Sequence, residues 1–185
     1  MQKHLFIIDP LEKLNRKIDT SLHLAQALSV LGAHIYFAEC TDFVWNSLLS
    51  GPRVMARKAV FGNSLLSLDM REYEEIALKD FSGVYMRKEP PVDVLYQSVL
   101  WMLESVGSET MIFNSPSAIL SFNEKVTTLL FPEESKPGLV SANRRCLLDY
   151  LHSECHGDSI VKPLDQFGGV GVERIQTGKN QAGLD

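Results

Sequence analysis

Short apolar runs alternate with amphipathic segments along most of the chain. The runs are bounded by polar residues, Gly or Pro, which predicts buried strands at residues 4–8, 34–39, 83–88 and 110–114. Residues 19–32 and 93–107 instead repeat apolar side chains at helical spacing. Asp19 or Thr20 can cap the first of these helices, and Gly32 is its expected stop signal.

Two strand–helix–strand sequences in succession predict right-handed crossovers and a mainly parallel sheet covered on both faces. The expected fold class is therefore α/β, with a three-layer sheet in an N-terminal domain at residues 1–122. Residues 53–62 are expected to form one strand of a hairpin. Residues 70–81 are polar, and their pattern predicts no element.

A different pattern begins at Asn123, and residues 123–185 are expected to form a second domain. We expect its elements to be a helix at 123–131, a strand at 139–141, a helix at 143–154, and strands at 158–163 and 171–176. The last two strands flank a glycine-rich loop.

Composition narrows the class of protein. The chain has 185 residues, of which 45% are hydrophobic and 22% charged, as in globular proteins. The net charge of −5 argues against a general nucleic-acid or membrane-surface binder, since such proteins are usually basic. No apolar run reaches the length of a membrane span. Three scattered cysteines suggest a reducing compartment, and we expect a cytoplasmic protein.

The stretch "VKPLDQFGGVG" at 161–171 combines a lysine with three glycines. Lys162 would end a strand and could extend its ammonium group toward an anion, while Gly168 and Gly169 can take positive φ values and aim N–H groups at phosphate oxygens. A plain hairpin turn explains the same residues equally well. Because the loop joins two strands, a flexible flap over phosphates is the expected form of any site.

Other basic residues fall at the ends of predicted elements. Arg87 and Lys88 follow a strand, and Lys125 lies at the start of an expected helix. Ligands of open parallel sheets bind beyond the carboxyl ends of the strands, where Arg87 is expected. Taken singly, each of these residues is also compatible with a solvated surface charge.

A set of short motifs resembles one enzyme family. "DP" at 9–10, "DTS" at 19–21, "MRKEPP" at 86–91, "FNSP" at 113–116, "NEK" at 123–125 and "VKPLDQFGG" at 161–169 occur in the order seen in bacterial glutathione synthetase. That family belongs to the ATP-grasp ligases. The resemblance implies an N-terminal pre-ATP-grasp domain followed by the start of an ATP-grasp lobe.

The resemblance also implies an activity, namely ligation of γ-glutamylcysteine to glycine through an acyl phosphate, with ATP and Mg²⁺. In its terms Lys125 and Lys162 match ATP-contacting lysines, Gly168 and Gly169 match the loop over the phosphates, and Arg87 falls in the motif that faces the peptide. No residue of this chain matches a catalytic or Mg²⁺-binding position, and no nucleic-acid or membrane partner is implied. We also expect a homo-oligomer.

The chain departs from the family pattern in two respects. Gln166 and Phe167 stand where glycine and methionine are more usual, and the family's Mg²⁺ ligands lie beyond Asp185. We therefore expect an N-terminal fragment that is inactive alone. Two alternatives remain open: another ATP-grasp carboxylate–amine ligase, or a non-catalytic folding or oligomerisation module.

One cluster suggests a metal site. Cys146, His152, Cys155 and His156 lie within eleven residues, and the last three share one side of a helix. Cys146 points elsewhere, so a helical core cysteine with two surface histidines is favoured over zinc. Cys40 is interpreted as a small core or rim residue.

Overall fold

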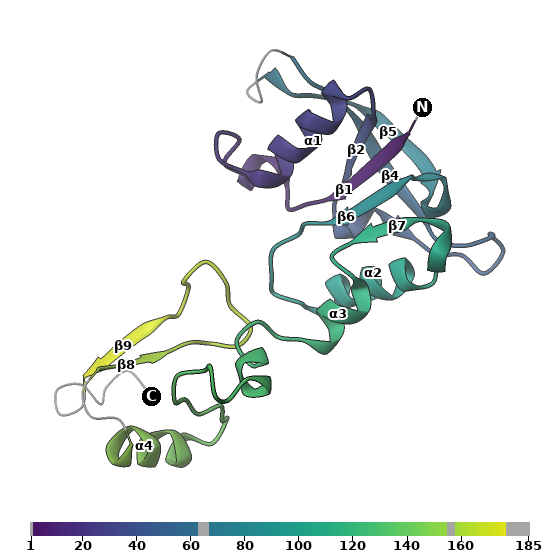
Figure 1. Ribbon diagram of the computed structural model, residues 1–185. Coiled ribbons are helices and arrows are strands. Elements are labelled where there is room, and N and C mark those ends of the chain that lie inside the picture. Colours follow the sequence, from purple (N-terminus) through teal and green to yellow (C-terminus); the bar gives the residue numbers. More distant parts are fainter. Residues whose placement is uncertain (1, 63–66, 155–157, 177–185) are drawn as a thin grey trace. The chain divides into compact units, whose positions relative to one another are not determined.

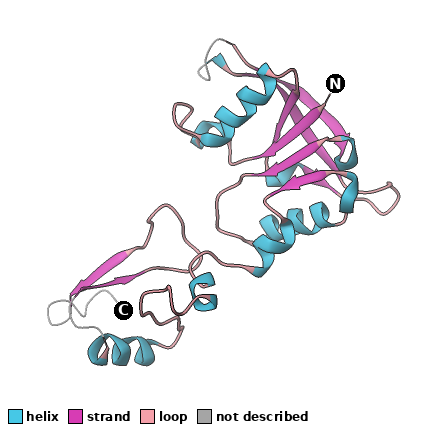
Figure 2. Cartoon of the chain, in the orientation of Figure 1, coloured by secondary structure: helices cyan, strands magenta, loops and turns pink. Residues whose placement is uncertain are grey.

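The structure is a computed structural model, and it describes residues 2–62, 67–154 and 158–176. These residues divide into two compact units, Met1–Ser121 and Phe122–Asp185. Figure 1 labels their elements and Figure 2 distinguishes helices from strands. None of the described helices has both the length and the apolar character needed to cross a membrane.

The first unit is built around one seven-stranded sheet. Its strands are β1 (Lys3–Ile7), β2 (His34–Ala38), β3 (Phe43–Val44), β4 (Arg53–Val60), β5 (Asp69–Ala77), β6 (Gly83–Met86) and β7 (Met111–Phe113). The order is β3-β4-β2-β1-β6-β7, with β5 paired to β4. Strands β2, β1, β6 and β7 are parallel, and β4 pairs antiparallel with β2, β3 and β5.

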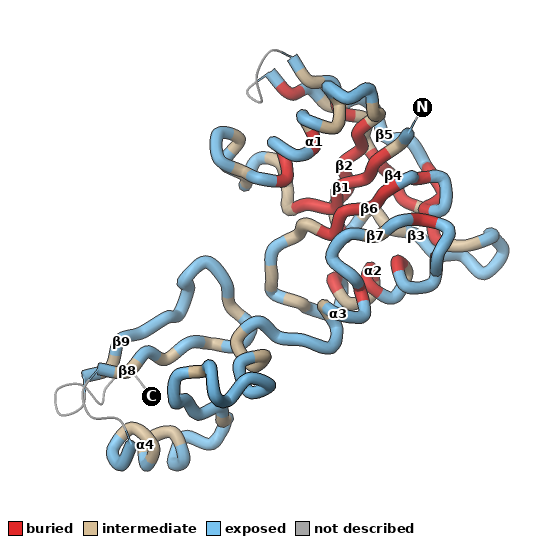
Figure 3. The backbone as a smooth tube through the Cα atoms, viewed as in Figure 1, coloured by how far each residue is buried: buried red, intermediate tan, exposed pale blue. Residues whose placement is uncertain are grey.

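Helices cover both faces of this sheet, which gives the three layers that the sequence predicts. The helices are α1 (Thr20–Val30), α2 (Val94–Glu104) and α3 (Pro116–Ser121). The side chains of β1 and the residue after it alternate between two hydrophobic cores, one on each face of the sheet. Leu5 and Ile7 pack in the core with α2, while Phe6 and Ile8 pack in the core with α1. Figure 3 shows the buried residues gathered along these strands.

The two long helices of this unit form where the sequence predicts them. The Asp19 carboxylate accepts the Leu22 N–H at 2.9 Å and caps α1, so Asp19 is the cap and Thr20 is the first helical residue. Gly32 has a φ of +90°, as expected just after a helix. In α2, helical spacing buries a single stripe of side chains, namely Tyr96, Val99, Leu100 and Leu103.

The second unit contains α4 (Arg144–Ser153) and an antiparallel pair, β8 (Asp158–Val161) and β9 (Glu173–Gln176). The strand–loop–strand prediction for the glycine-rich stretch is thus confirmed. No residue in the described part of this unit is classed as buried. None of the described apolar side chains there leaves water completely, so burial stabilises this unit less than the first.

Two predictions about elements are wrong, and other elements were not predicted. Residues 123–131 do not form an α-helix but a turn followed by a 3₁₀ helix at Thr127–Leu130, and residues 139–141 are not a strand. Helix α3 was not predicted, and neither was β5, which occupies much of the stretch 70–81. Strand β5 pairs through its backbone with β4, while most of its side chains remain exposed.

Candidate functional site

The predicted motifs of the first unit meet at one edge of its sheet. Strands β1, β6 and β7 are parallel, so their carboxyl ends share an edge. Asp9 follows β1, Arg87 and Lys88 follow β6, and Asn114 follows β7. Segments far apart in the sequence are therefore adjacent where an α/β sheet binds its ligands.

Arg87 is held against the first turn of α1. Its Nε donates to the Ser21 hydroxyl at 3.1 Å, and its Nη2 donates to the Thr20 hydroxyl at 3.0 Å. Its backbone N–H also donates to the Ile7 carbonyl at 2.9 Å, which fixes the residue at the strand end. Arg87 forms no ion pair with the described residues, so no carboxylate neutralises its charge there.

Lys88 is neutralised, in contrast to its neighbour. Its Nζ lies 3.2 Å from the Asp9 carboxylate, and both side chains are mostly buried. The second Asp9 oxygen accepts the Glu89 N–H at 2.8 Å. Lys88 also lies over the Tyr96 ring, 5.6 Å from its centroid, and Tyr96 donates its hydroxyl to the Lys88 carbonyl. The Asp9–Lys88 pair therefore ties the loop after β1 to the loop after β6.

Asn114 connects the end of β7 to the same edge. Its backbone has a φ of +63°, in the left-handed region that Asn tolerates better than most residues. The side-chain amide donates to the Met86 carbonyl at 2.7 Å. This contact secures the last residue of β6, directly before Arg87.

Two titratable groups near this edge stay neutral. Burial raises the pKa of the Cys40 thiol to about 11 and that of the Tyr96 hydroxyl to about 12. Neither group is ionised near neutral pH, so neither can act there as an anionic nucleophile. The interpretation of Cys40 as a core or rim residue is confirmed, since only 4% of its surface is exposed.

In the second unit, the "NEK" motif binds the glycine-rich loop. The Asn123 side-chain amide donates to the Leu164 carbonyl at 3.0 Å, and Lys125 Nζ donates to the Gln166 carbonyl at 2.6 Å. Lys125 also forms an ion pair with Glu124 at 2.9 Å. Lys125, which the family resemblance assigns to ATP, is thus adjacent to the loop that the resemblance assigns to the ATP phosphates.

The loop glycines have different structural roles. Gly168, Gly169 and Gly171 all have positive φ values, of +59°, +82° and +68°. A Cβ on Gly171 would lie 2.7 Å from Pro163 Cγ, so close packing also requires glycine there. A Cβ on Gly168 or Gly169 would meet nothing within 4 Å, so these two need glycine only for their backbone conformation. Both are exposed and leave space for a ligand.

Lys162 follows β8 and is exposed. Its exposure is compatible with a ligand contact and with a solvated surface charge. Lys125 and the glycine loop are brought together within the second unit, and Arg87 is placed at the sheet edge of the first. Sequence reasoning missed Thr20 and Ser21 as partners of Arg87. The signal was present in the "DTS" motif, which caps and starts a helix at the same expected edge as "MRKEPP".

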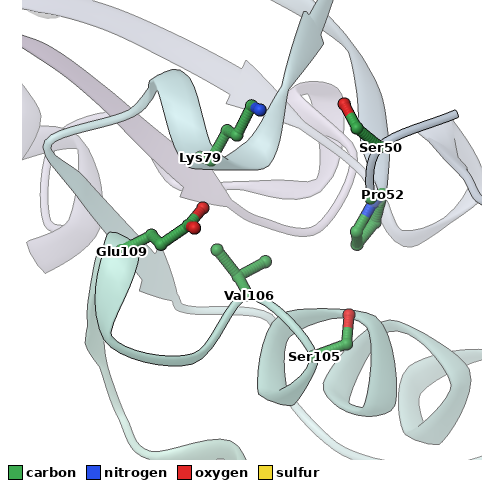
Figure 4. A pocket seen from close by; sticks show the side chains of 7 residues that line it. Ser50, Pro52, Lys79, Ser105, Val106 and Glu109 are labelled. Carbon is green, nitrogen blue, oxygen red and sulfur yellow. The ribbon is translucent and has the colours of Figure 1, made fainter.

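Among the described residues, neither a metal cluster nor the pocket shown in Figure 4 marks the candidate site. No group of three or more His, Cys, Asp or Glu side chains among the described residues could hold a metal ion. Cys155 and His156 of the weighed zinc site lie outside the described residues. A pocket lies beside the carboxyl-terminal end of α2, where Ser105 and Val106 line it (Figure 4). None of its lining residues belongs to the sheet edge that carries Asp9, Arg87 and Asn114, here called the Arg87 edge. It is lined by Ser50, Gly51, Pro52, Lys79, Ser105, Val106 and Glu109.

Comparison with known proteins gives the family. Residues 2–119 match the family described as "Prokaryotic glutathione synthetase, N-terminal domain". The chain belongs to the prokaryotic glutathione synthetase family. The match spans almost the whole first unit, including every element of the Arg87 edge. The predicted family is therefore confirmed.

Curated relatives extend the likeness through the second unit. A glutathione synthetase of Nitrosomonas europaea is 32% identical over 98% of this chain, and one of Synechocystis sp. is 32% identical over 95%. A glutathione synthetase of Salmonella typhimurium is 31% identical over 96% of the chain. The chain spans a little over half the length of these relatives, 56–57%.

Proposed function

We propose that the complete gene product containing this chain is a glutathione synthetase, an ATP-dependent ligase that joins γ-glutamylcysteine to glycine. The observation that carries the proposal is the family match over residues 2–119, together with similarity over nearly the whole chain to relatives that bear this name. The Arg87 edge supports it independently, because a cation that has no acidic partner among the described residues suits a substrate that carries two carboxylates.

The proposed reaction has two steps. An oxygen of the cysteinyl carboxylate takes the γ-phosphoryl group of ATP, which gives an acyl phosphate and ADP. The glycine amine then attacks the acyl carbon, loses a proton, and displaces inorganic phosphate as the amide bond forms. The protein has to bind several anionic groups and to keep water away from the acyl phosphate.

We assign parts of this task to the residues of the two units. Arg87 contacts a carboxylate of the dipeptide, while Lys125 and Lys162 contact the ATP phosphates and Gly168 and Gly169 cover them. The adjacency of Lys125 to the glycine loop supports the second assignment. In this proposal residues 1–122 form the substrate-side domain and 123–185 begin the ATP-grasp domain.

Mg²⁺ is the expected metal, supplied with ATP. The described residues contain no cluster suited to holding it, so we assign no residue of this chain to the ion. A cytoplasmic location, expected from the three scattered cysteines, and a homo-oligomeric state belong to the same proposal.

The test is synthesis of glutathione by the purified complete gene product. It is incubated with γ-glutamylcysteine, glycine and Mg-ATP, and the peptide product is followed by mass spectrometry together with ADP. We expect glutathione and ADP in equal amounts. ADP release only with a different pair of acyl and amine substrates would instead favour another ATP-grasp ligase, and no ADP with any pair would favour a non-catalytic module.

A further inference from the structure

The first turn of α1 supplies both hydrogen-bond acceptors of the Arg87 side chain. Ser21 Oγ accepts from Nε and Thr20 Oγ1 accepts from Nη2. Ser21 is 5% exposed, so its hydroxyl has little access to water, and the guanidinium is its partner. The two contacts join residues that are 66 and 67 positions apart in the sequence.

Part of the Arg87 guanidinium has no hydrogen-bond partner among the residues that the structure describes. The group has five N–H donors in a rigid plane, and the two hydroxyls accept from two of them. No described residue accepts a hydrogen bond from the third nitrogen of the Arg87 guanidinium, Nη1. Two contacts, on adjacent nitrogens, are enough to fix both the position and the plane of the group.

The backbone at the start of α1 does not itself attract a cation. The N-terminal turn of a helix carries partial positive charge, and a guanidinium beside it is repelled. Asp19, the cap of α1, directs its carboxylate to the Leu22 N–H and forms no ion pair with Arg87. Hydroxyls can hold the guanidinium there without neutralising it, whereas a carboxylate partner would compete with an anionic ligand.

We propose that Thr20 and Ser21 are positioning residues for the γ-glutamylcysteine site. They hold the Arg87 guanidinium in one orientation, so that its remaining donors meet a substrate carboxylate without first losing rotamer entropy. The inference rests on the proposed function, and it adds two residues that act through Arg87 rather than on the substrate.

A purely structural role is the competing explanation, because the same hydrogen bonds also link β6 to α1. The two explanations predict different effects of substituting Thr20 or Ser21 when Arg87 is absent. A positioning pair affects binding of the dipeptide only while Arg87 is present, whereas a structural link affects the fold, and hence every substrate, with or without it.

The experiment is a steady-state comparison in the complete gene product. The variants are Thr20→Val, which keeps the shape of the side chain, Ser21→Ala, and the conservative Thr20→Ser. Ser98→Ala is the matched control, since its hydroxyl also belongs to a helix, α2, but donates to the Val94 carbonyl of the same helix. Each variant except the control is made in the wild-type and in the Arg87→Ala background.

We expect Thr20→Val and Ser21→Ala each to raise KM for γ-glutamylcysteine about five- to tenfold, the effect of one lost hydrogen bond. KM for ATP should change less than about twofold, and Thr20→Ser should behave as wild type. In the Arg87→Ala background neither substitution should have a further effect. Equal increases in KM for both substrates, or effects that add to that of Arg87→Ala, would overturn the inference.

A spectroscopic readout separates this inference from the proposed function. The Arg87 Nε–H resonance, assigned by its loss in Arg87→Ala, should exchange slowly with solvent in the wild type and faster in Ser21→Ala. Rapid exchange in the wild type would overturn the inference whatever the enzyme does. Slow exchange in a protein that makes no glutathione would overturn the proposed function and leave the hydrogen-bond geometry intact.

Discussion

Replacing Asp9 with alanine should destabilise the first unit through a small number of identified contacts. Asp9 accepts from Lys88 Nζ at 3.2 Å and from the Glu89 N–H at 2.8 Å. Its side chain is 23% exposed and that of Lys88 is 18% exposed, so the pair is screened from water but not fully buried. Without Asp9, Lys88 keeps the Glu89 carbonyl as an acceptor at 3.0 Å, but it loses its counter-ion.

The magnitude follows from these contacts. Hydrogen bonds that involve a charged group contribute about 1.5–3 kcal/mol, and breaking a fully buried ion pair costs about 3–5 kcal/mol. Because water reaches part of the pair and one lysine contact survives, we expect Asp9→Ala to lower the free energy of unfolding by about 2 kcal/mol. Asp9→Asn keeps an acceptor for the Glu89 N–H and should cost about 1 kcal/mol.

Urea unfolding followed by tryptophan fluorescence measures this effect. Trp45 and Trp101 are the two tryptophans of the chain, and both lie in the first unit, so the signal reports on that unit. Glu72→Ala is the control, since this exposed carboxylate of β5 forms no ion pair with the described residues. If Asp9→Ala lowers the free energy of unfolding no more than the control does, the contacts of Asp9 do not stabilise this edge and the reasoning is refuted.

Three further substitutions or probes test other parts of the structure. Gly83→Ala would place a Cβ 2.9 Å from His4 Nδ1 in the core, and we expect thermal unfolding to show a loss of about 1–3 kcal/mol, the usual cost of overpacking; unchanged stability would mean that His4 lies elsewhere. Lys162→Ala should raise KM for ATP roughly ten- to a hundredfold in the complete gene product, whereas unchanged kinetics would make Lys162 a surface charge. Iodoacetamide at pH 8 should alkylate the exposed Cys146 and leave Cys40 unmodified in the folded chain, since burial raises the Cys40 pKa to about 11; mass spectrometry that finds Cys40 modified first would contradict its burial.

The sequence predicted the parallel part of the sheet because local signals and tertiary structure agree there. The apolar runs of β1, β2 and β6 are buried, and α1 begins and ends where its cap and its glycine indicate. Strand β5 escaped prediction because most of its residues face solvent, so no alternating apolar pattern marks it. Backbone pairing with β4 decides its conformation, and that pairing is not encoded in the local pattern of β5.

The expected helix at 123–131 failed for a different reason. The Asn123 and Lys125 side chains bind carbonyls of the glycine-rich loop, and the Asn123 side-chain oxygen accepts the Lys125 N–H at 2.9 Å. These contacts hold the start of the segment in a turn, and only Thr127–Leu130 forms a 3₁₀ helix. Tertiary hydrogen bonds thus override a local preference for helix.

The location of the candidate site could be predicted from the sequence, but the hydrogen-bond and ion-pair partners of its residues could not. The position of Arg87 after a parallel strand predicts that it lies at the carboxyl edge of the sheet, and the structure confirms that position. That Arg87 bonds to hydroxyls while Lys88 bonds to Asp9 depends on the relative placement of β1, β6 and α1. The sequence shows two adjacent basic residues, and only the structure distinguishes the neutralised one from the other. The roles of Arg87, Lys125, Lys162, Gly168 and Gly169 toward substrates stay predictions.

The most direct test of the proposed activity follows the carboxylate oxygen. γ-Glutamylcysteine labelled with ¹⁸O in its cysteinyl carboxylate is incubated with glycine, Mg-ATP and the complete gene product, and the phosphate released is analysed by mass spectrometry. If the carboxylate is phosphorylated before the amine attacks, one ¹⁸O atom appears in each inorganic phosphate formed with glutathione. Unlabelled phosphate, or phosphate released without glutathione, would contradict the proposal that this chain belongs to an acyl-phosphate-forming glutathione synthetase.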